Sequence, residues 1–523
     1  MMTITKILSL SLLAAFGSLL HAETYRENIP DLNDNPSQLQ SIPMLQSLKN
    51  LQLDKDYRAP LVQVLKNRNG VNSLFVESQD LPMVDIQLTF NAGSARDEEV
   101  EKGLYGVANM AARLIDEGTE KYNATQIASV FDQTGAQFSV QAHRDMFVVR
   151  LRVLSDPKKL EPALSMMMDV IKNATFKNSS LNLALSNNQA GQKQLQESPS
   201  RLMNIRFYRA VYGTHPYAEP ITGTNGSIKK ITPDILKKFR NQFLVAQNMN
   251  IAITGKLSKK EAQNLAERIS GNLNQGEKAK ALAQPEEKQG FDIIHLPYNS
   301  TQANVMFGHL GTTRDNKDRL ALEVANRMFG GGGFNSVLMQ ELRVKRGYTY
   351  GAYSAFSFSQ APGIFSFSYG TRQDQLIDSI QVAHKAFNDF VKMPIDQKQM
   401  EETKAGMLRA FPNNYSSNAT INAQLGLLGF YQQDPDYLTQ YPKLLEKITV
   451  TDVQNAVRTY MHPENITVIV VSKTLDKNEV QQILEKNVQA APTKIIPTTK
   501  AVPLPKPEVD VLAQTPSDKH ASI

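Results

Sequence analysis

The chain contains no cysteine among its 523 residues. This absence excludes thiol catalysis and any zinc or iron–sulfur site built on cysteine. Charge of one sign is not concentrated either, because 57 Lys and Arg are scattered among 51 Asp and Glu and the net charge is +6. Nucleic-acid binding needs a clustered basic face, so we expect no nucleic-acid partner.

Histidine is also scarce, and the eight that occur are isolated from one another. No two of them have the i, i+4 spacing with which a helix grips zinc, although His143 and His215 could meet in space. The segment His215-Pro216-Tyr217 predicts a structural turn. A Gly-x-Ser-x-Gly nucleophile motif is absent as well. The histidines are His21, His143, His215, His295, His309, His384, His462 and His520.

Long hydrophobic runs are missing beyond the first 22 residues. Residues 1–22 have a positive start at Lys6, an apolar stretch from Ile7 to Leu20 and a small residue at Ala22. This pattern predicts a signal peptide and a periplasmic location, with an uncleaved anchor as the alternative. We expect no stable membrane span in the mature protein, whose 41% hydrophobic and 21% charged residues are ordinary for a globular chain.

What the chain does contain is a long internal repeat, in which short segments recur in order about 217 residues later. The period is too long for a solenoid and indicates a duplicated domain. We predict a lead-in at 23–55, halves at 56–273 and 291–489, a linker at 274–290 and a disordered Pro- and Lys-rich tail at 490–523. The matching pairs are Val107-Ala108-Asn109 with Val324-Ala325-Asn326, Lys230-Ile231-Thr232 with Lys447-Ile448-Thr449, Asn248 with Asn465, and Arg96-Asp97 with Arg314-Asp315.

Hydrophobic periodicity predicts an α+β fold for each half. We expect a mostly antiparallel sheet with helices on one face in each half, the two halves facing each other across a chamber. Asn69-Gly70 lies between two short apolar runs and predicts a hairpin. Strands are expected at 61–65, 73–76, 84–90, twice within 138–153 and at 249–254, and helices at 102–116, 157–172, 180–196 and 233–244.

Several motifs together resemble the pitrilysin-type metallopeptidases, the inverzincin family of insulinase and mitochondrial processing peptidase. The resemblance covers about residues 60–490 and includes the duplication that the family has. It implies two homologous α+β halves and a zinc helix with the motif His-x-x-Glu-His. The matching segments are 90–98, the helix from Gly106 to Gly118-Thr119, 212–217, 223–232, Gly330 to Gly333, and Leu342-Arg343 through Tyr350.

Within this resemblance the zinc positions are occupied by other residues. Asn109, Ala112 and Arg113 stand where the family has His, Glu and His. Asparagine is a weak neutral ligand, alanine cannot act as a base, and arginine is a fixed cation. The family's third ligand is a Glu on a later helix, yet no acidic residue occurs between Asp169 and Glu197. The resemblance therefore implies no metal in this chain and zinc in a partner.

The second half keeps an Arg/Tyr pair of the family, here Arg343 and Tyr350. The resemblance implies that such a pair holds the substrate backbone and stabilises the oxyanion. The alternative is an arginine in a helix-end salt bridge and a tyrosine packed in a sheet, with Tyr348 and Tyr353 as rival tyrosines. The run Gly330, Gly331, Gly332, Gly333 precedes a helix expected at 337–345. It lacks the Lys-Ser/Thr of a phosphate loop, so backbone flexibility beside a packed helix is favoured over a phosphate cradle.

These features predict a zinc-less subunit of a heteromeric periplasmic zinc metallopeptidase, inactive on its own. Its expected partners are a homologous zinc-bearing peptidase subunit and a peptide substrate. One alternative is a protein of the cell envelope that binds peptides without cleaving them. Another is scaffolding, as in the core subunits of a respiratory cytochrome complex.

Overall fold

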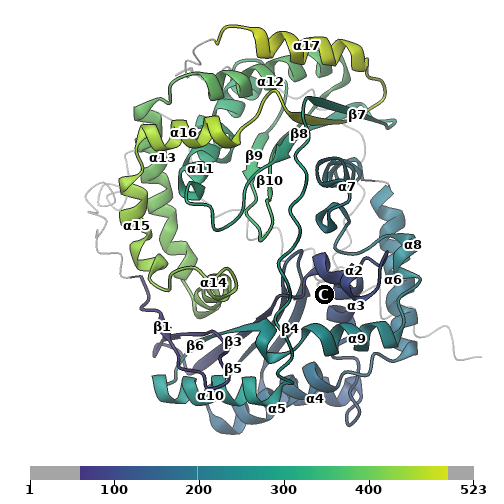
Figure 1. The fold of residues 1–523 in the computed structure, drawn as a ribbon, viewed down its shortest axis with the longest axis vertical. Coiled ribbons are helices and arrows are strands. Elements are labelled where there is room, and N and C mark those ends of the chain that lie inside the picture. Colours follow the sequence, from purple (N-terminus) through teal and green to yellow (C-terminus); the bar gives the residue numbers. More distant parts are fainter. Residues whose placement is uncertain (1–58, 197, 493–523) are drawn as a thin grey trace, which may run out of the picture. The chain divides into compact units, whose positions relative to one another are not determined.

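The computed structural model describes residues 59–196 and 198–492. The predicted signal peptide, the lead-in and the tail from residue 493 onward lie outside the described residues. The described chain contains two β-sheets with many helices, and the element order of the first half recurs in the second (Figure 1). Among the described helices, none is both long and apolar enough to cross a membrane.

Apart from the additional edge strand β1 (Gln63–Val64) of the first sheet, the two sheets share one strand order, which confirms two homologous α+β halves. In each sheet a single pair of neighbours is parallel, β2 with β6 in the first and β7 with β11 in the second, and the other pairs are antiparallel. The first sheet runs β1 (Gln63–Val64), β2 (Ser73–Glu77), β6 (Met249–Gly255), β3 (Met83–Phe90), β5 (Phe147–Leu154), β4 (Gln137–Ala142). The second runs β7 (Phe291–Pro297), β11 (Ile466–Ser472), β8 (Gln302–Leu310), β10 (Ile364–Arg372), β9 (Ala352–Phe356).

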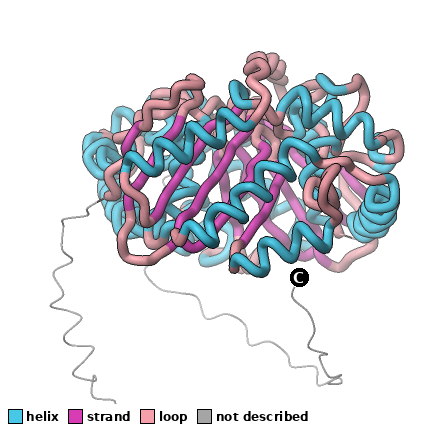
Figure 2. Tube along the Cα trace, turned by 90° about the horizontal axis from the view of Figure 1, so that it is seen from below, coloured by secondary structure: helices cyan, strands magenta, loops and turns pink. Residues whose placement is uncertain are grey.

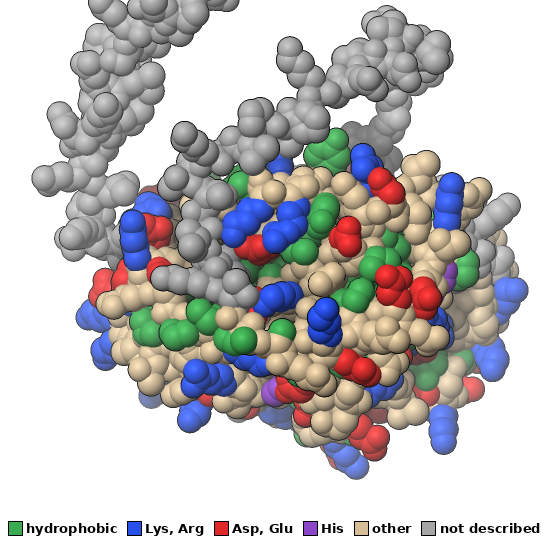
Figure 3. All heavy atoms as spheres, turned by 90° about the horizontal axis from the view of Figure 1, so that it is seen from above, with side chains coloured by type: hydrophobic (Ala, Val, Ile, Leu, Met, Phe, Trp, Pro, Cys, Tyr) green, Lys and Arg blue, Asp and Glu red, His purple; other side chains and the backbone are tan. Residues whose placement is uncertain are grey.

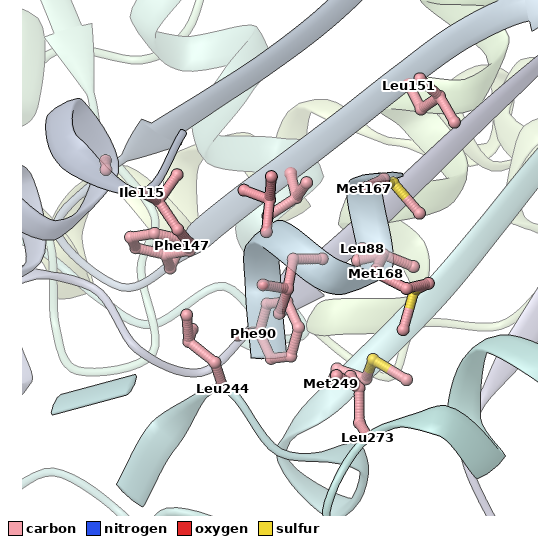
Figure 4. Packing of buried hydrophobic residues seen from close by; sticks show 14 of the residues in the cluster. Leu88, Phe90, Ile115, Phe147, Leu151, Met167, Met168, Leu244, Met249 and Leu273 are labelled. Carbon is pink, nitrogen blue, oxygen red and sulfur yellow. The ribbon is translucent and has the colours of Figure 1, made fainter. Parts of the chain in front are cut away.

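Except for α7 (Pro199–Tyr212), the helices of the first half pack on the apolar face of their own sheet, and Figure 2 shows helices lying across strands. Alternation along β3 directs Leu88 and Phe90 to this face, where they pack with Phe147, Leu151 and Met167 (Figure 4). The helices are α2 (Asp97–Val100), α3 (Val107–Leu114), α4 (Ala124–Thr134), α5 (Pro157–Asn173), α6 (Asn178–Gln196), α7 (Pro199–Tyr212), α8 (Asn225–Ile228), α9 (Pro233–Phe243) and α10 (Lys259–Asn272).

Helices of the second half build a separate core around Phe307, Phe329, Phe367 and Phe387. Two π-helical segments interrupt this half, Arg327–Gly331 directly after α11 and Met339–Val344 after the glycine run. The helices are α11 (Arg319–Asn326), α12 (Leu376–Lys392), α13 (Gln397–Ala410), α14 (Asn418–Phe430), α15 (Tyr437–Lys447), α16 (Val450–Tyr460) and α17 (Lys477–Gln489).

The two halves exchange one helix each, which was not expected from the sequence. Helix α14 packs on β3 and β6 of the first sheet, and α7, its counterpart in the repeat, packs on β8 and β11 of the second. Nδ2 of Asn422 in α14 donates to the backbone oxygen of Asp85 at 3.0 Å. The sheet face opposite the first-half core is therefore covered by the other half of the chain.

A buried carboxylate also joins the halves. Asp145, only 4% exposed, accepts hydrogen bonds from the hydroxyl of Tyr217 in the first half and from two groups of the second half. These are the Tyr431 hydroxyl at 3.3 Å and the Gln360 amide at 2.9 Å. A carboxylate surrounded by three donors is satisfied without exposure to water.

Two predicted segments differ in detail from the structure. The helix expected over 102–116 begins only at Val107, because Gly106 takes the left-handed conformation with φ of 95°. Residues 274–289 form no helix or strand, but they are held in place: Asn274 accepts from the Ala246 amide at 2.8 Å, and Ala283 is bound by His215 at 2.9 Å. The exact domain boundaries stay predictions.

Candidate functional site

Helix α3, which carries the predicted zinc positions, is fixed at its first turn by the buried side chain of Asp97. Its carboxylate accepts from the backbone amides of Gly106, Val107 and Ala108 at 2.6, 3.1 and 2.8 Å. Burial raises the pKa of Asp97 to about 7, while these three amide donors act in the opposite direction. The sequence therefore retains the scaffold of the helix although the metal residues have changed.

The three side chains at the predicted zinc positions differ in their exposure to solvent. Ala112 is buried, Asn109 is half-buried and Arg113 is exposed to solvent. Helix α6 packs against α3 and carries no acidic residue along its length. The donor set is one amide and one guanidinium, which does not fit a zinc ion that prefers imidazole and carboxylate ligands. Within the described residues, no group of three His, Asp or Glu could hold a metal.

His215 forms the structural turn predicted for it. Its Nε2 lies 2.9 Å from the Ala283 oxygen, and its Nδ1 accepts from the Tyr217 amide at 3.1 Å at the start of a 3-10 turn over Pro216–Ala218. Both ring nitrogens are used in these hydrogen bonds. The side chain therefore has no free nitrogen to share with His143 in a metal site.

Arg343 and Tyr350 lie together on the surface of the second half. Nη1 of Arg343 donates to the backbone oxygen of Tyr350 at 2.6 Å, and the Tyr350 side chain is 83% exposed. The guanidinium also lies 4.4 Å from the ring centroid of Phe334, a cation–π distance. The sequence predicted the arginine and the tyrosine, and the structure joins them through a backbone carbonyl.

The alternative interpretation predicted a helix-end salt bridge for Arg343, but neighbouring basic residues form that salt bridge instead. Lys345 and Arg346 each reach the carboxylate of Glu341 at 2.6 Å. Arg343 makes no ion pair with any residue that the structure describes. Of the rival tyrosines, Tyr348 packs against the core, whereas Tyr353 is 59% exposed on β9.

The glycine run serves close packing and a sharp turn. A methyl group on Gly330 would lie 2.6 Å from Oγ of Ser354, and one on Gly331 would lie 2.9 Å from Nδ2 of Asn326. Gly333 takes a φ of +75°, which L side chains rarely adopt. The turn then presents Phe334, which is 56% exposed and was missed by the sequence analysis. Its position directly after the glycines is the signal that could have identified it.

The fold and this site define a class: an α+β protein of two homologous halves with the layout of a zinc peptidase and other residues at the metal positions. Comparison with known families agrees. The model described as Insulinase (Peptidase family M16) matches residues 74–225, and the model described as Peptidase M16 inactive domain matches residues 230–407. The chain belongs to peptidase family M16, as an inactive pitrilysin-type member.

Individual relatives extend this result. The solved structure of a peptidase M16 inactive domain from Pseudomonas fluorescens has a TM-score of 0.74 and 33% identity, covering 79% of this chain and 98% of that one. An uncharacterized zinc protease of Rickettsia bellii is 28% identical, covering 65% of this chain and 80% of the relative. The non-peptidase homolog YmxG of Helicobacter pylori is 24% identical, covering 79% and 94%.

Proposed function

We propose that this chain is the zinc-less subunit of a periplasmic M16 peptidase, in which Arg343 and Tyr350 act on peptide bound to a zinc-bearing partner. The observation that carries the proposal is the Arg343–Tyr350 contact on the solvent-exposed surface. A pair kept for packing would be buried or tied into an ion pair, whereas Tyr350 is 83% exposed and Arg343 makes no ion pair with the residues that the structure describes. This pair and a zinc-binding helix from a homologous chain would together complete one active site.

The chemistry of the pair suits a peptide backbone. Arg343 holds the Tyr350 segment with Nη1, and its guanidinium has further N–H donors for substrate carbonyls. The exposed Tyr350 hydroxyl can donate to an oxyanion that develops when water attacks the peptide carbonyl. Zinc in the partner would supply the activated water. This chain contributes binding and charge stabilisation.

The face of the second half shown in Figure 3 gives no support to a nucleic-acid role. Lys and Arg side chains are interspersed with Asp and Glu on this face. Such mixed charge does not build the continuous positive field that a phosphate backbone requires. A peptide partner agrees better with the aromatic and arginine side chains Phe334, Arg343 and Tyr350, residue types that are enriched at protein–protein interfaces.

A second candidate is peptide binding without cleavage. The likeness to a relative named a non-peptidase homolog, of which 94% is covered, favours it. The same exposed pair would then hold peptides in the periplasm with no catalytic partner. The two candidates differ in whether turnover appears when a zinc-bearing homologue is added.

The test uses the chain without residues 1–22 and a homologous M16 chain of the same organism that carries an intact His-x-x-Glu-His motif. Turnover of an internally quenched peptide is measured for each chain alone and for the mixture, with size-exclusion chromatography of the mixture. We expect a complex and turnover well above the sum of the separate chains. Hydrolysis by this chain alone, or a mixture that neither associates nor gains activity, would contradict the proposal.

A further inference from the structure

A cavity of about 290 Å³ lies in the second half, away from the Arg343 and Tyr350 side chains. It opens among α11, α13, α15 and the end of β9, which lie next to one another in Figure 1. No part of the proposed peptidase function uses it. Its lining residues are Glu323, Asn326, Arg327, Phe356, Phe358, Met407, Ala410, Phe411, Asn414 and Tyr441.

Part of the cavity wall consists of four aromatic side chains that form two stacked pairs. Phe356 and Phe358 stack with ring centroids 5.3 Å apart and an interplanar angle of 7°. Phe411 and Tyr441 stack at 4.0 Å and 12°. Met407 adds a polarisable thioether to the lining. Planar walls of this kind pack well against another planar ring, and the volume suffices for one aromatic side chain, being at the lower end of ligand pockets.

The edge of the cavity carries the positive charge of Arg327. Glu323 accepts from Arg319 at 2.6 Å, so its charge is already paired. Arg327 is exposed and makes no ion pair with any residue that the structure describes. A carboxylate is the group that such a free guanidinium binds best, because the two can form parallel charge-assisted hydrogen bonds.

Asn326 supplies an oriented hydrogen-bond donor beside that charge. Its Oδ1 accepts from Oγ of Ser354 at 2.7 Å, which fixes the amide and makes Nδ2 the available end. In the internal repeat Asn326 corresponds to Asn109, and α13 corresponds to α6, so the cavity occupies in the second half the place of the degenerate zinc positions in the first.

We propose that this cavity binds an aromatic side chain whose own residue carries a free carboxylate. The ring lies against the stacked aromatic walls, and the carboxylate lies on Arg327 and Nδ2 of Asn326. Two sources present this chemistry, the C-terminal residue of a peptide and a free aromatic amino acid. The site needs no zinc-bearing partner and stands independently of the proposed peptidase role.

The chain contains no tryptophan, so a tryptophan ligand can be followed by its own fluorescence. The probe is N-acetyltryptophan, titrated with the chain without residues 1–22. We expect saturable binding, with N-acetyltryptophanamide bound about ten-fold more weakly because it lacks the charge that Arg327 meets. N-acetylleucine should compete at least about ten-fold less well, since it has no ring to stack. Equal affinity for the acid, the amide and the leucine compound would overturn the proposal.

Three variants locate the site. Arg327→Gln changes an exposed side chain and should weaken N-acetyltryptophan about ten-fold with an unchanged melting temperature. Ala410→Phe should fill the cavity and abolish binding. Asn326→Asp keeps the acceptor for Ser354 but places a negative charge beside the ligand, and Asn109→Asp at the corresponding position of the first half is its matched control. Wild-type binding by folded Arg327→Gln and Asn326→Asp would refute the site whatever Ala410→Phe does.

The two sources are separated by comparing free tryptophan with a tetrapeptide that ends in tryptophan. Tighter binding of the tetrapeptide identifies a peptide C-terminus, and tighter binding of free tryptophan identifies the amino acid. Either order supports the shared chemistry if Arg327→Gln weakens both. Binding of neither compound at millimolar concentration would overturn it.

Discussion

Tyr350 is the residue on which the proposed catalytic contribution depends most directly. Its side chain is 83% exposed, so loss of the hydroxyl removes no internal contact of the described chain. Tyr350→Phe should leave the melting temperature unchanged and lower the turnover of the two-chain complex by about 10²-fold, the usual effect of losing one oxyanion donor. Tyr353→Phe, at another exposed tyrosine, is the matched control and should retain wild-type turnover. Equal turnover in both variants would remove the catalytic role of Tyr350.

Arg343 has two roles, and replacing it should change the kinetics differently from replacing Tyr350. It orders the Tyr350 backbone at 2.6 Å and has N–H groups left for substrate. Arg343→Ala should therefore raise KM as well as lower kcat, whereas Tyr350→Phe should act mainly on kcat. Steady-state kinetics of the complex measure both constants. A variant that loses thermal stability but keeps both constants would show that Arg343 is structural.

At the scale of single residues, the sequence was informative where a motif fixes the spacing between its residues. It identified Arg343 and Tyr350 as candidate site residues, whose role stays a prediction, and Asn109, Ala112 and Arg113 as the residues at the zinc positions. It could not reveal the contact of Phe334 with Arg343, because that contact depends on the turn that the glycines form. It also could not separate Tyr350 from its rivals, because exposure is set by tertiary packing.

Strand β3 shows what element-level patterns can and cannot predict. The alternation from Val84 to Phe90 gave the strand and its apolar face, and β3 spans Met83–Phe90. The alternating polar residues Asp85, Gln87 and Thr89 are nonetheless buried. Local periodicity cannot identify the element that packs on this face of the strand, which is α14 from a distant part of the chain. A signal was present in α14, which bears apolar residues around much of its circumference, as buried helices do.

Gly426 makes the close approach of α14 to β3 possible. A methyl group there would lie 1.8 Å from Nε2 of Gln87, a buried side chain held by Thr89 and by Arg150 at 2.9 Å. Gly426→Ala should lower the free energy of unfolding by about 1–3 kcal/mol, because overpacking outweighs the gain in helix propensity. Gly406→Ala in α13 is the control: its methyl group would come no nearer than 3.8 Å to Arg409, so it should be neutral or stabilising. Denaturant unfolding measures the stability of both variants. Equal unfolding free energies for Gly426→Ala and Gly406→Ala would contradict the tight contact.

At the scale of the whole molecule, Asp145 links the halves through Tyr217, Tyr431 and the Gln360 amide. All three groups donate to the carboxylate, so Asp145→Asn would place an amide N–H against another donor. We expect a loss of about 2 kcal/mol or more in unfolding free energy, as for a buried polar group left unsatisfied. Tyr431→Phe, which removes one donor and adds none, should cost less. If both variants unfold like the wild type, the carboxylate does not hold the halves together.

Two buried histidines of the second half are expected to make the stability of the chain depend on pH. His309 uses Nδ1 toward the Leu310 oxygen at 2.7 Å and accepts from the His462 amide at 3.1 Å. His384 uses Nε2 toward the Pro463 oxygen at 2.9 Å and has Asn487 Nδ2 at 3.4 Å from Nδ1. In each ring one nitrogen donates and the other accepts, so the neutral form satisfies both. Burial lowers the pKa of each histidine to about 4.

The sign of the effect follows from proton uptake. An unfolded histidine titrates near pH 6.5, so between about pH 6.5 and 4 the unfolded chain binds protons that the folded chain does not. Stability should therefore be complete above about pH 6.5 and fall as the pH is lowered, by on the order of 2 kcal/mol per histidine at pH 5. Asp97 acts in the opposite direction, because its pKa is raised to about 7 in the folded chain. The measurement is thus a comparison: denaturant unfolding at pH 7 and pH 5 for wild type, His309→Gln and His384→Gln. Each variant should be less stable at pH 7 yet lose less stability on acidification, and an unchanged loss would show that these histidines are already protonated in the folded protein.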